Sequence, residues 1–189
     1  MAPRLFPMFL KLENRACLVV GAGTVAESKI TSLLESSACV TVVAPTANAA
    51  ISRLADAKAI RWLRRKFRPS DLRGIFLSIA ATSDPKVNGT VFEIAHRLGV
   101  LCNAVDDPPH CDFYFPAVVR RGDLQVAIST AGQSPALAQQ LRTELDEALE
   151  PSWEARVRRI GEARRRIIER HRPSPGRKRM LKQLAYSWR

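Results

Sequence analysis

Apolar residues are grouped along the chain in short blocks that predict a repeating order of strands and helices. Residues 60–65 alternate between apolar and polar side chains, and four nearly unbroken apolar runs stand at 16–20, 39–43, 75–82 and 100–105. Continuous apolar runs are typical of parallel strands buried on both faces, and an alternating run is typical of an edge strand. Apolar residues recur at helical spacing after the first run, in residues 25–34, and again between the last two runs, from Pro85 to Leu98. The first part of the chain is therefore predicted to be an α/β unit with a parallel sheet.

The pattern changes near residue 112. Residues 113–119 and 124–128 predict two strands around a turn at 120–123, which is a hairpin and not another strand–helix–strand unit. A helix is expected from Pro135, with Ser134 as its N-cap, and leucines follow at intervals of four residues. This leucine stripe, made of Leu137, Leu141, Leu145 and Leu149, is either core or a dimer seam. A small α+β domain is the prediction.

A third, strongly basic segment begins at residue 151. Residues 151–189 contain 13 Lys and Arg against 3 Asp and Glu, which is ten of the chain's twelve net positive charges. A narrow apolar stripe at helical spacing predicts a docked helix with arginines on its other sides: Val157, Ile160, Ala163 and Ile167. Such a helix is either only solvated or binds nucleic acid or a polyanionic small substrate. The expected domains are 1–112, 113–150 and 151–189.

The most specific motif is the turn between the first predicted strand and the helix after it, Gly21, Ala22, Gly23, Thr24, Val25 and Ala26. Glycines at these positions allow a tight turn and close approach of the backbone to a pyrophosphate, which binds the free N–H groups of the following helix. We therefore expect a Rossmann-type domain that binds NAD(P). The acidic residue usual after the second strand is missing, because Ala44, Pro45 and Thr46 stand there, so the choice between NAD and NADP is open.

Thr82, Asp106 and Asp107 follow other strands, so they are expected at the same carboxyl edge of the sheet, where Thr82 is predicted to bind the cofactor. A carboxylate there can act as a general base, and Asp106 is the candidate. The alternative is that it forms an Asx turn before the prolines at 108 and 109, a role for which Asp107 is the better candidate.

Composition narrows the class of protein. The chain has no long apolar segment that would span a membrane or act as a secretory leader, and its four cysteines form no CxxC pair. Three of the cysteines lie in apolar strand-like runs, so we expect a cytoplasmic protein with small, buried, reduced cysteines and no metal site. Neighbouring His110, Cys111 and Asp112 point in different directions along an extended stretch and are expected to be structural.

Several motifs together resemble the precorrin-2 dehydrogenase family, the dehydrogenase and ferrochelatase module of sirohaem synthase without its methyltransferase domain. The resemblance covers about residues 1–150. It is carried by residues 5–10, the glycine turn with Glu27-Ser28-Lys29, residues 80–82 with Asn88, residues 103–106, Phe115-Pro116 and residues 128–136.

The resemblance implies that the chain oxidises precorrin-2, a tetrapyrrole with eight carboxylates, to sirohydrochlorin by transferring hydride to NAD⁺. It also implies that Asp106 is the essential aspartate and that Thr24, Val25, Pro45 and Thr46 contact the nucleotide. Bifunctional members then insert Fe²⁺, and members are homodimers through the second domain. Thr130 stands where some relatives have a serine that can be phosphorylated, which leaves regulation open.

An octacarboxylate substrate would give the basic residues a partner, because arginines pair with carboxylates. The expected substrate-binding residues are Arg120, Arg121, Ser129, Thr130, Gly132 and Ser134, the last four before a helix N-terminus. The alternative is an NAD-binding, redox-sensing regulator whose basic tail binds nucleic acid. The tail has neither a helix-turn-helix pattern nor interleaved aromatic residues, which would favour this alternative. No nucleic-acid partner is therefore expected.

Overall fold

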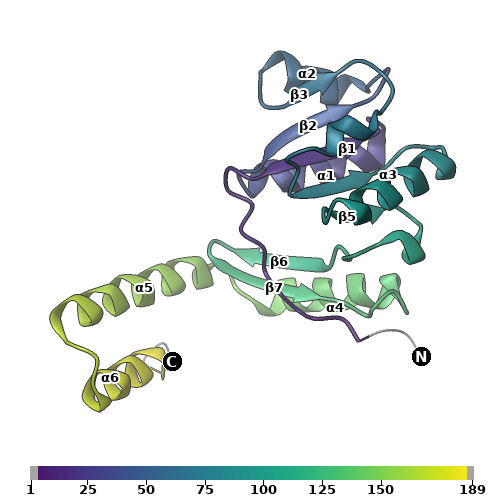
Figure 1. The fold of residues 1–189 in the computed structure, drawn as a ribbon. Helices are drawn as coiled ribbons and strands as arrows, with labels where there is room; N and C mark the ends of the chain where they lie inside the picture. Colours follow the sequence, from purple (N-terminus) through teal and green to yellow (C-terminus); the bar gives the residue numbers. More distant parts are fainter. Residues whose placement is uncertain (1–3, 187–189) are drawn as a thin grey trace. The chain divides into compact units, whose positions relative to one another are not determined.

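The computed structural model describes residues 4–186 and divides into two units between Tyr114 and Phe115. The first unit contains a five-stranded, wholly parallel sheet in the order β3-β2-β1-β4-β5 (Figure 1). Its strands are β1 (Ala16–Val20), β2 (Cys39–Val43), β3 (Arg61–Leu63), β4 (Leu77–Ala80) and β5 (Leu101–Ala104). This is the Rossmann-type sheet that the apolar runs predict, and β3 is the edge strand.

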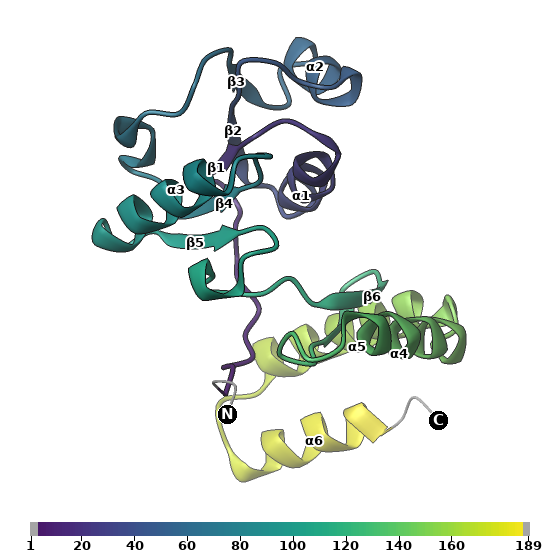
Figure 2. The same ribbon diagram turned by 90° about the vertical axis from the view of Figure 1, so that its right-hand side faces the viewer.

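Helices cover both faces of this sheet, as Figure 2 shows for α1 and α3 on opposite sides. The helices are α1 (Thr24–Glu35), α2 (Ala49–Asp56) and α3 (Pro85–Arg97), and two short 3₁₀ turns are η1 (Pro69–Leu72) and η2 (Pro108–His110). The central strands β1 and β4 supply fully buried residues such as Leu18 and Ile79. The apolar pattern did not predict α2, whose N-terminus is capped by the side chain of Asn48.

The second unit contains a two-stranded antiparallel sheet and three helices. These elements are β6 (Ala117–Arg121), β7 (Leu124–Ile128), α4 (Pro135–Ala148), α5 (Ser152–Arg170) and α6 (Pro175–Tyr186). The hairpin turn is shorter than predicted, because both strands extend to it and only Gly122 and Asp123 form it. Gly122 has φ +57°, a left-handed conformation that glycine adopts without steric cost. Residues 113–116, predicted as strand, lie before β6.

The C-terminal segment forms two helices and not one. The apolar stripe of α5 is half-buried, and α5 packs against both β7 and α6. Residues 151–186 belong to the second unit, so the three-domain division at 112 and 150 stays a prediction. Within residues 4–186, no helix is both long and apolar enough to cross a lipid bilayer.

Candidate functional site

The strand order of the first unit reverses between β1 and β4, and ligands of open parallel sheets bind at the carboxyl ends of strands at such a point. A cleft of about 910 Å³ lies there. Six of the eight residues predicted to bind the cofactor line it: Gly21, Ala22, Gly23, Pro45, Thr46 and Thr82. The other two, Thr24 and Val25, lie in the first turn of α1.

Geometry requires glycine at the first position of the turn but not at the second. Gly21 has φ +110°, and a Cβ atom there would lie 2.2 Å from the carbonyl oxygen of Ala81 at the end of β4. Only glycine therefore lets the ends of β1 and β4 approach this closely. Gly23 has φ −90°, and a Cβ atom there would meet no atom within 4 Å. Gly23 thus leaves open space at the wall of the cleft.

The start of α1 fits a pyrophosphate. Gly23 is the N-cap and supplies no side-chain hydrogen bond to the first turn. The first N–H groups of the helix, those of Thr24 and Val25 among them, have no partner within the helix, and the helix dipole adds partial positive charge. The residues present therefore fit a dinucleotide.

Hydrogen bonds brace the wall of the cleft on the β2 side. The side-chain oxygen of Asn48 accepts a hydrogen bond from the Ile51 N–H at 2.9 Å, and its amide nitrogen donates to Oε2 of Glu27 at 2.6 Å. The Asn48 N–H also donates to the carbonyl oxygen of Ala22 at 3.1 Å. Asn48 thus ties the loop after β2 to the glycine turn and to α1.

A second brace lies on the β4 side. The buried side chain of Asn88 on α3 accepts hydrogen bonds from the N–H of Thr82 at 3.1 Å and from its hydroxyl at 2.7 Å. The Asn88 amide nitrogen donates to the Thr82 carbonyl oxygen at 3.1 Å. These three bonds fix Thr82 at the mouth of the cleft.

Asp106 and Asp107 follow β5 and differ in their contacts. Asp107 lies 2.7 Å from Nδ1 of His110 and precedes η2, which is a structural role. Asp106 is exposed and has φ +60°, a left-handed conformation uncommon for non-glycine residues and least costly for Asp and Asn. Burial lowers the pKa of Lys29 on α1, and the nearby negative charge of Asp106 opposes this shift. The charges of Lys29 and of the candidate base therefore interact.

The residues after Asp107 each have a local partner. The Cys111 thiol donates to the Ala104 carbonyl oxygen at 3.1 Å, and the Asp112 carboxylate accepts from the Cys102 N–H at 2.9 Å. Among residues 4–186 there is no group of three or more His, Cys, Asp or Glu side chains that could hold a metal ion.

In the second unit, four of the six predicted substrate residues lie on the turn between β7 and α4, and the other two, Arg120 and Arg121, lie in β6. Ser134 caps α4 as expected, because its hydroxyl accepts a hydrogen bond from the Leu137 N–H at 3.2 Å. The Ser129 and Thr130 hydroxyl oxygens accept from the N–H groups of Ala131 and Ser134, both at 3.1 Å. Each hydroxyl hydrogen can still donate to a ligand. Gly132 has φ +79° and gives the turn its left-handed corner.

The structure gives Arg121 a role that the sequence did not predict. Its guanidinium donates to the carbonyl oxygens of Leu149 and Asp146 at 2.7 and 2.6 Å, and to the Asp146 carboxylate at 2.9 Å. These bonds tie the C-terminal end of α4 to the hairpin. Arg121 therefore has a structural role and is not part of the proposed substrate-binding set. Its neighbour Arg120 is exposed.

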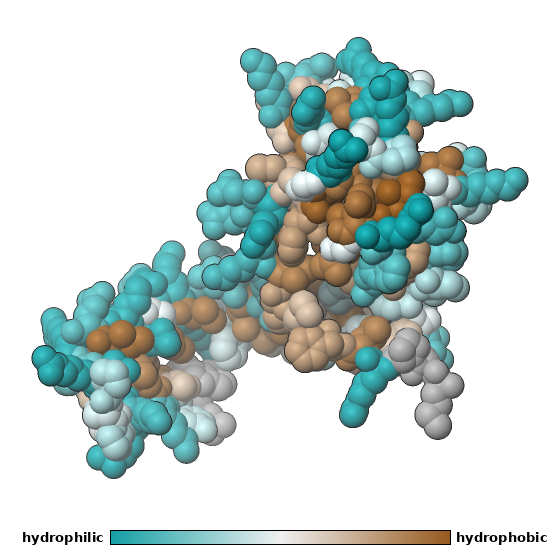
Figure 3. All heavy atoms as spheres, viewed as in Figure 1, coloured by the Kyte–Doolittle hydropathy of each residue, from teal (hydrophilic) through white to brown (hydrophobic). Residues whose placement is uncertain are grey.

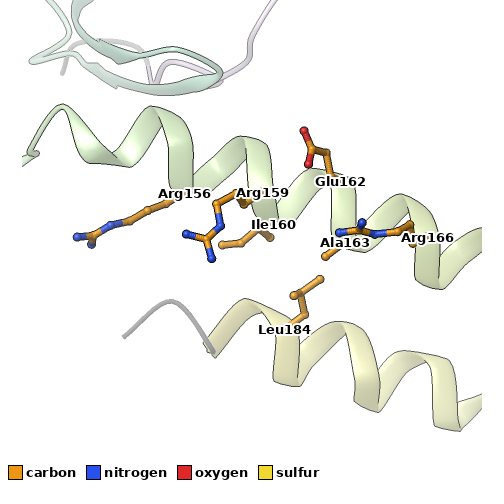
Figure 4. Close-up of a pocket in the computed structure, with 7 residues that line it drawn as sticks. All are labelled: Arg156, Arg159, Ile160, Glu162, Ala163, Arg166 and Leu184. Atoms are coloured by element: carbon orange, nitrogen blue, oxygen red, sulfur yellow. The ribbon is translucent and has the colours of Figure 1, made fainter.

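A second cavity, of about 600 Å³, lies between α5 and α6 (Figure 4). Apolar residues gather on the facing sides of these helices, and hydrophilic residues occupy their outer sides (Figure 3). The cavity is lined by Arg156, Arg159, Ile160, Glu162, Ala163, Arg166 and Leu184, and the Glu162 carboxylate points away from α6 (Figure 4). Arg156 is engaged by Glu150 at 3.5 Å and by the Trp153 ring.

Comparisons with known proteins agree with this geometry. Residues 8–117 match the family described as "Putative NAD(P)-binding", and residues 121–148 match "Sirohaem biosynthesis protein central". The solved structure of SirC, a precorrin-2 dehydrogenase, superposes with a TM-score of 0.79 at 30% identity, covering 95% of this chain and 89% of that one. The chain belongs to the precorrin-2 dehydrogenase family. Its first unit is an NAD(P)-binding domain, in agreement with the predicted NAD cofactor.

The curated relatives that this chain matches are longer than this chain. A siroheme synthase from Methylococcus capsulatus is 44% identical over 85% of this chain and 34% of its own length. Siroheme synthase 1 from Yersinia enterocolitica is 42% identical over 97% of this chain and 39% of its own length. The chain thus spans between a third and two fifths of the length of these relatives.

Sequence reasoning missed three residues that shape the site. The Glu27–Asn48 pair joins residues 21 positions apart, and no local pattern predicts such a contact. An available signal was Asn48 itself, because Asn before an apolar helical stretch is a common N-cap. Lys29 was noted only as part of a motif, although its charge interacts with that of Asp106.

Proposed function

We propose that this protein oxidises precorrin-2 to sirohydrochlorin, with NAD⁺ as hydride acceptor. The observation that carries the proposal is an exposed strand-end carboxylate, Asp106, in the same unit as a dinucleotide cleft, in a chain of the precorrin-2 dehydrogenase family. The alternative of a redox-sensing regulator is not favoured by these relatives.

The oxidation removes one hydride and one proton from the macrocycle, so the products are sirohydrochlorin, NADH and a proton. NAD⁺, when bound, supplies the hydride-accepting nicotinamide. Asp106 takes the proton as general base, and its carboxylate must be ionised to do so. The braces at Thr82 and Asn48 hold the cleft in shape before the dinucleotide binds.

The substrate's carboxylates are proposed to bind the turn between β7 and α4. The hydroxyls of Ser129 and Thr130, the backbone at Gly132 and the N-terminus of α4 at Ser134 offer hydrogen-bond donors and partial positive charge. Exposed Arg120 adds a guanidinium suited to a carboxylate. The basic helices α5 and α6 are proposed to contribute further attraction.

The functional form is proposed to be a homodimer through the second unit. In one copy of the chain, Leu137 and Leu141 of α4 are 46% and 36% exposed, while Leu145 and Leu149 are half-buried. Leu137 and Leu141 lie one helical turn apart, and a second copy of the same face supplies a symmetric cover for them. The four cysteines are unpaired, which suits the reducing cytoplasm as the compartment of the enzyme.

Insertion of Fe²⁺ into sirohydrochlorin is a second candidate activity, favoured by the relatives that are named siroheme synthase. In this reaction iron is a substrate, and Asp106 would accept protons from the pyrrole nitrogens as the metal enters.

The test is an anaerobic assay with purified protein, precorrin-2 and NAD⁺, in which the absorbance of NADH and of the tetrapyrrole is followed together. Equal rates of NADH and sirohydrochlorin formation are expected, followed by faster sirohaem formation on addition of Fe²⁺ than in buffer. Absence of NADH formation would refute the dehydrogenase proposal. If duplex DNA binds instead in a salt-dependent manner, the regulator is the better hypothesis.

A further inference from the structure

The cleft lacks the acidic residue that follows β2 in many NAD-binding Rossmann domains. That residue binds the ribose hydroxyls and repels the 2′-phosphate of NADP, whereas a basic residue at this place accommodates the phosphate. After β2 this chain has Ala44, Pro45 and Thr46, none of them charged. The discrimination between the two dinucleotides must therefore come from residues that lie elsewhere in the sequence.

The structure brings a carboxylate to this end of the cleft from α1. Asn48 lines the cleft, and its amide holds Oε2 of Glu27 at 2.6 Å. The orientation of that amide is fixed, because its oxygen accepts from the Ile51 N–H and only its nitrogen remains to face the carboxylate. Both side chains are half-buried, so their charges are less screened than on an open surface.

We infer that Glu27, held by Asn48, takes the place of the missing acidic residue and makes the cleft prefer NAD to NADP. This inference rests on the proposed function and concerns the specificity of the same cleft. Asn48 is held by Ile51, Glu27 and Ala22, so the pair acts by position and charge: it fixes the loop after β2 and sets a negative charge behind that loop.

One cation at the same cleft acts in the opposite direction. Lys66, which follows β3, also lines the cleft and would attract a 2′-phosphate. The other charged side chains of the lining, Asp84 and Lys86, lie at the start of α3, beyond β4, and not beside β2. The inference therefore requires that the Glu27 charge outweighs that of Lys66 where the 2′-phosphate would bind.

The test compares dissociation constants of NAD⁺ and NADP⁺ by calorimetry at one ionic strength. Glu27→Gln keeps the length of the side chain and an oxygen for Asn48, and removes only the charge. We expect the wild type to prefer NAD⁺ and the variant to lose roughly fivefold or more of this preference, mainly through tighter NADP⁺ binding. Asn48→Ser keeps an N-cap oxygen but loses the amide, so it should weaken both the preference and NAD⁺ binding.

The matched control is Glu35→Gln, which removes the same charge at the other end of α1. The two positions are eight residues apart, about 12 Å along the helix, which exceeds the screening length at physiological salt. Its preference should equal that of the wild type. Lys66→Met should increase the preference for NAD⁺.

An unchanged preference in Glu27→Gln, or a wild type that binds NADP⁺ as tightly as NAD⁺, would overturn the inference while leaving the dehydrogenase proposal intact. A wild type that binds neither dinucleotide would overturn both. Thermal unfolding of each variant checks that differences in binding do not arise from unfolding.

Discussion

Substitution of Gly21 by alanine tests the close approach of β1 and β4 that forms the cleft. The added Cβ atom would lie 2.2 Å from the Ala81 oxygen and 2.6 Å from the Ala81 carbonyl carbon. Both are backbone atoms at the end of a buried strand, so no side-chain rotation can relieve the overlap. The N–H of Gly21 also donates to the Val43 carbonyl oxygen at 3.0 Å, which ties its position to β2 as well.

Two costs add in this variant. A non-glycine residue at φ +110° is strained by about 1–3 kcal/mol, and moving packed backbone away from an inserted atom costs about 1–3 kcal/mol more. The free energy of unfolding should therefore fall by about 2–6 kcal/mol, a large part of the roughly 5–15 kcal/mol usual for a domain. At about 2–4 °C per kcal/mol for a chain of this size, the melting temperature falls by roughly 5–20 °C.

Gly23→Ala is the matched control, because the same methyl group meets no atom within 4 Å and φ is −90°. It should melt near the wild-type temperature but bind NAD⁺ more weakly, since its methyl group points into open space at the cleft. Gly23→Glu should weaken binding at least tenfold, about 1.4 kcal/mol. Calorimetric melting and NAD⁺ titration measure both effects. Wild-type melting of Gly21→Ala would refute the steric argument, and unchanged NAD⁺ affinity of a folded Gly23→Glu would refute the assigned pyrophosphate site.

Three further predictions concern the proposed reaction. Asp106→Asn should fold and bind NAD⁺ but lose roughly 10²–10⁴-fold in turnover, while Asp107→Asn keeps most of it; the opposite result in the anaerobic assay would exchange their roles. Light scattering should give a dimer at micromolar concentration, and Leu141→Glu should yield a monomer; a wild-type monomer would make the leucine stripe an ordinary surface. The double variant Arg159→Gln/Arg166→Gln should raise KM for the tetrapyrrole roughly two- to tenfold and change kcat less, because remote charges add uniform binding; unchanged kinetics would exclude these arginines.

The parallel sheet could be predicted from the sequence because each of its strands has a pattern of apolar residues within its own segment. Strands β1 and β4 are buried on both faces and appear as nearly unbroken apolar runs, and β3 is an edge strand and alternates. The glycine turn was also predictable, since backbone geometry requires glycine at position 21, and Gly23 leaves open space at the cleft. The hairpin was found, but its strand limits were not, because Pro116 and the two-residue turn restrict β6 to Ala117–Arg121.

Contacts between distant residues could not be predicted in this way. Arg121 looked like a substrate ligand from charge alone, yet its hydrogen bonds go to Asp146 and Leu149, 25 and 28 residues later. An arginine that closes a helix end and one that binds a carboxylate ligand have the same local sequence signal. In the same way, the charge pattern of α5 does not predict that α6 packs against α5 and forms the cavity beside Arg159.

Backbone conformation distinguishes the roles of the two aspartates after β5, which could not be distinguished from the sequence. Asp107 is used by His110 and the start of η2, whereas Asp106 is turned outward by a left-handed φ of +60°. Asp and Asn tolerate that conformation better than other side chains with a Cβ atom, because their short polar groups can bond locally. Alanine at position 106 would therefore change both the backbone and the charge, and a loss of activity could come from either. Asparagine keeps the conformation and the shape, so only a missing proton acceptor can explain an inactive, folded Asp106→Asn that still binds NAD⁺.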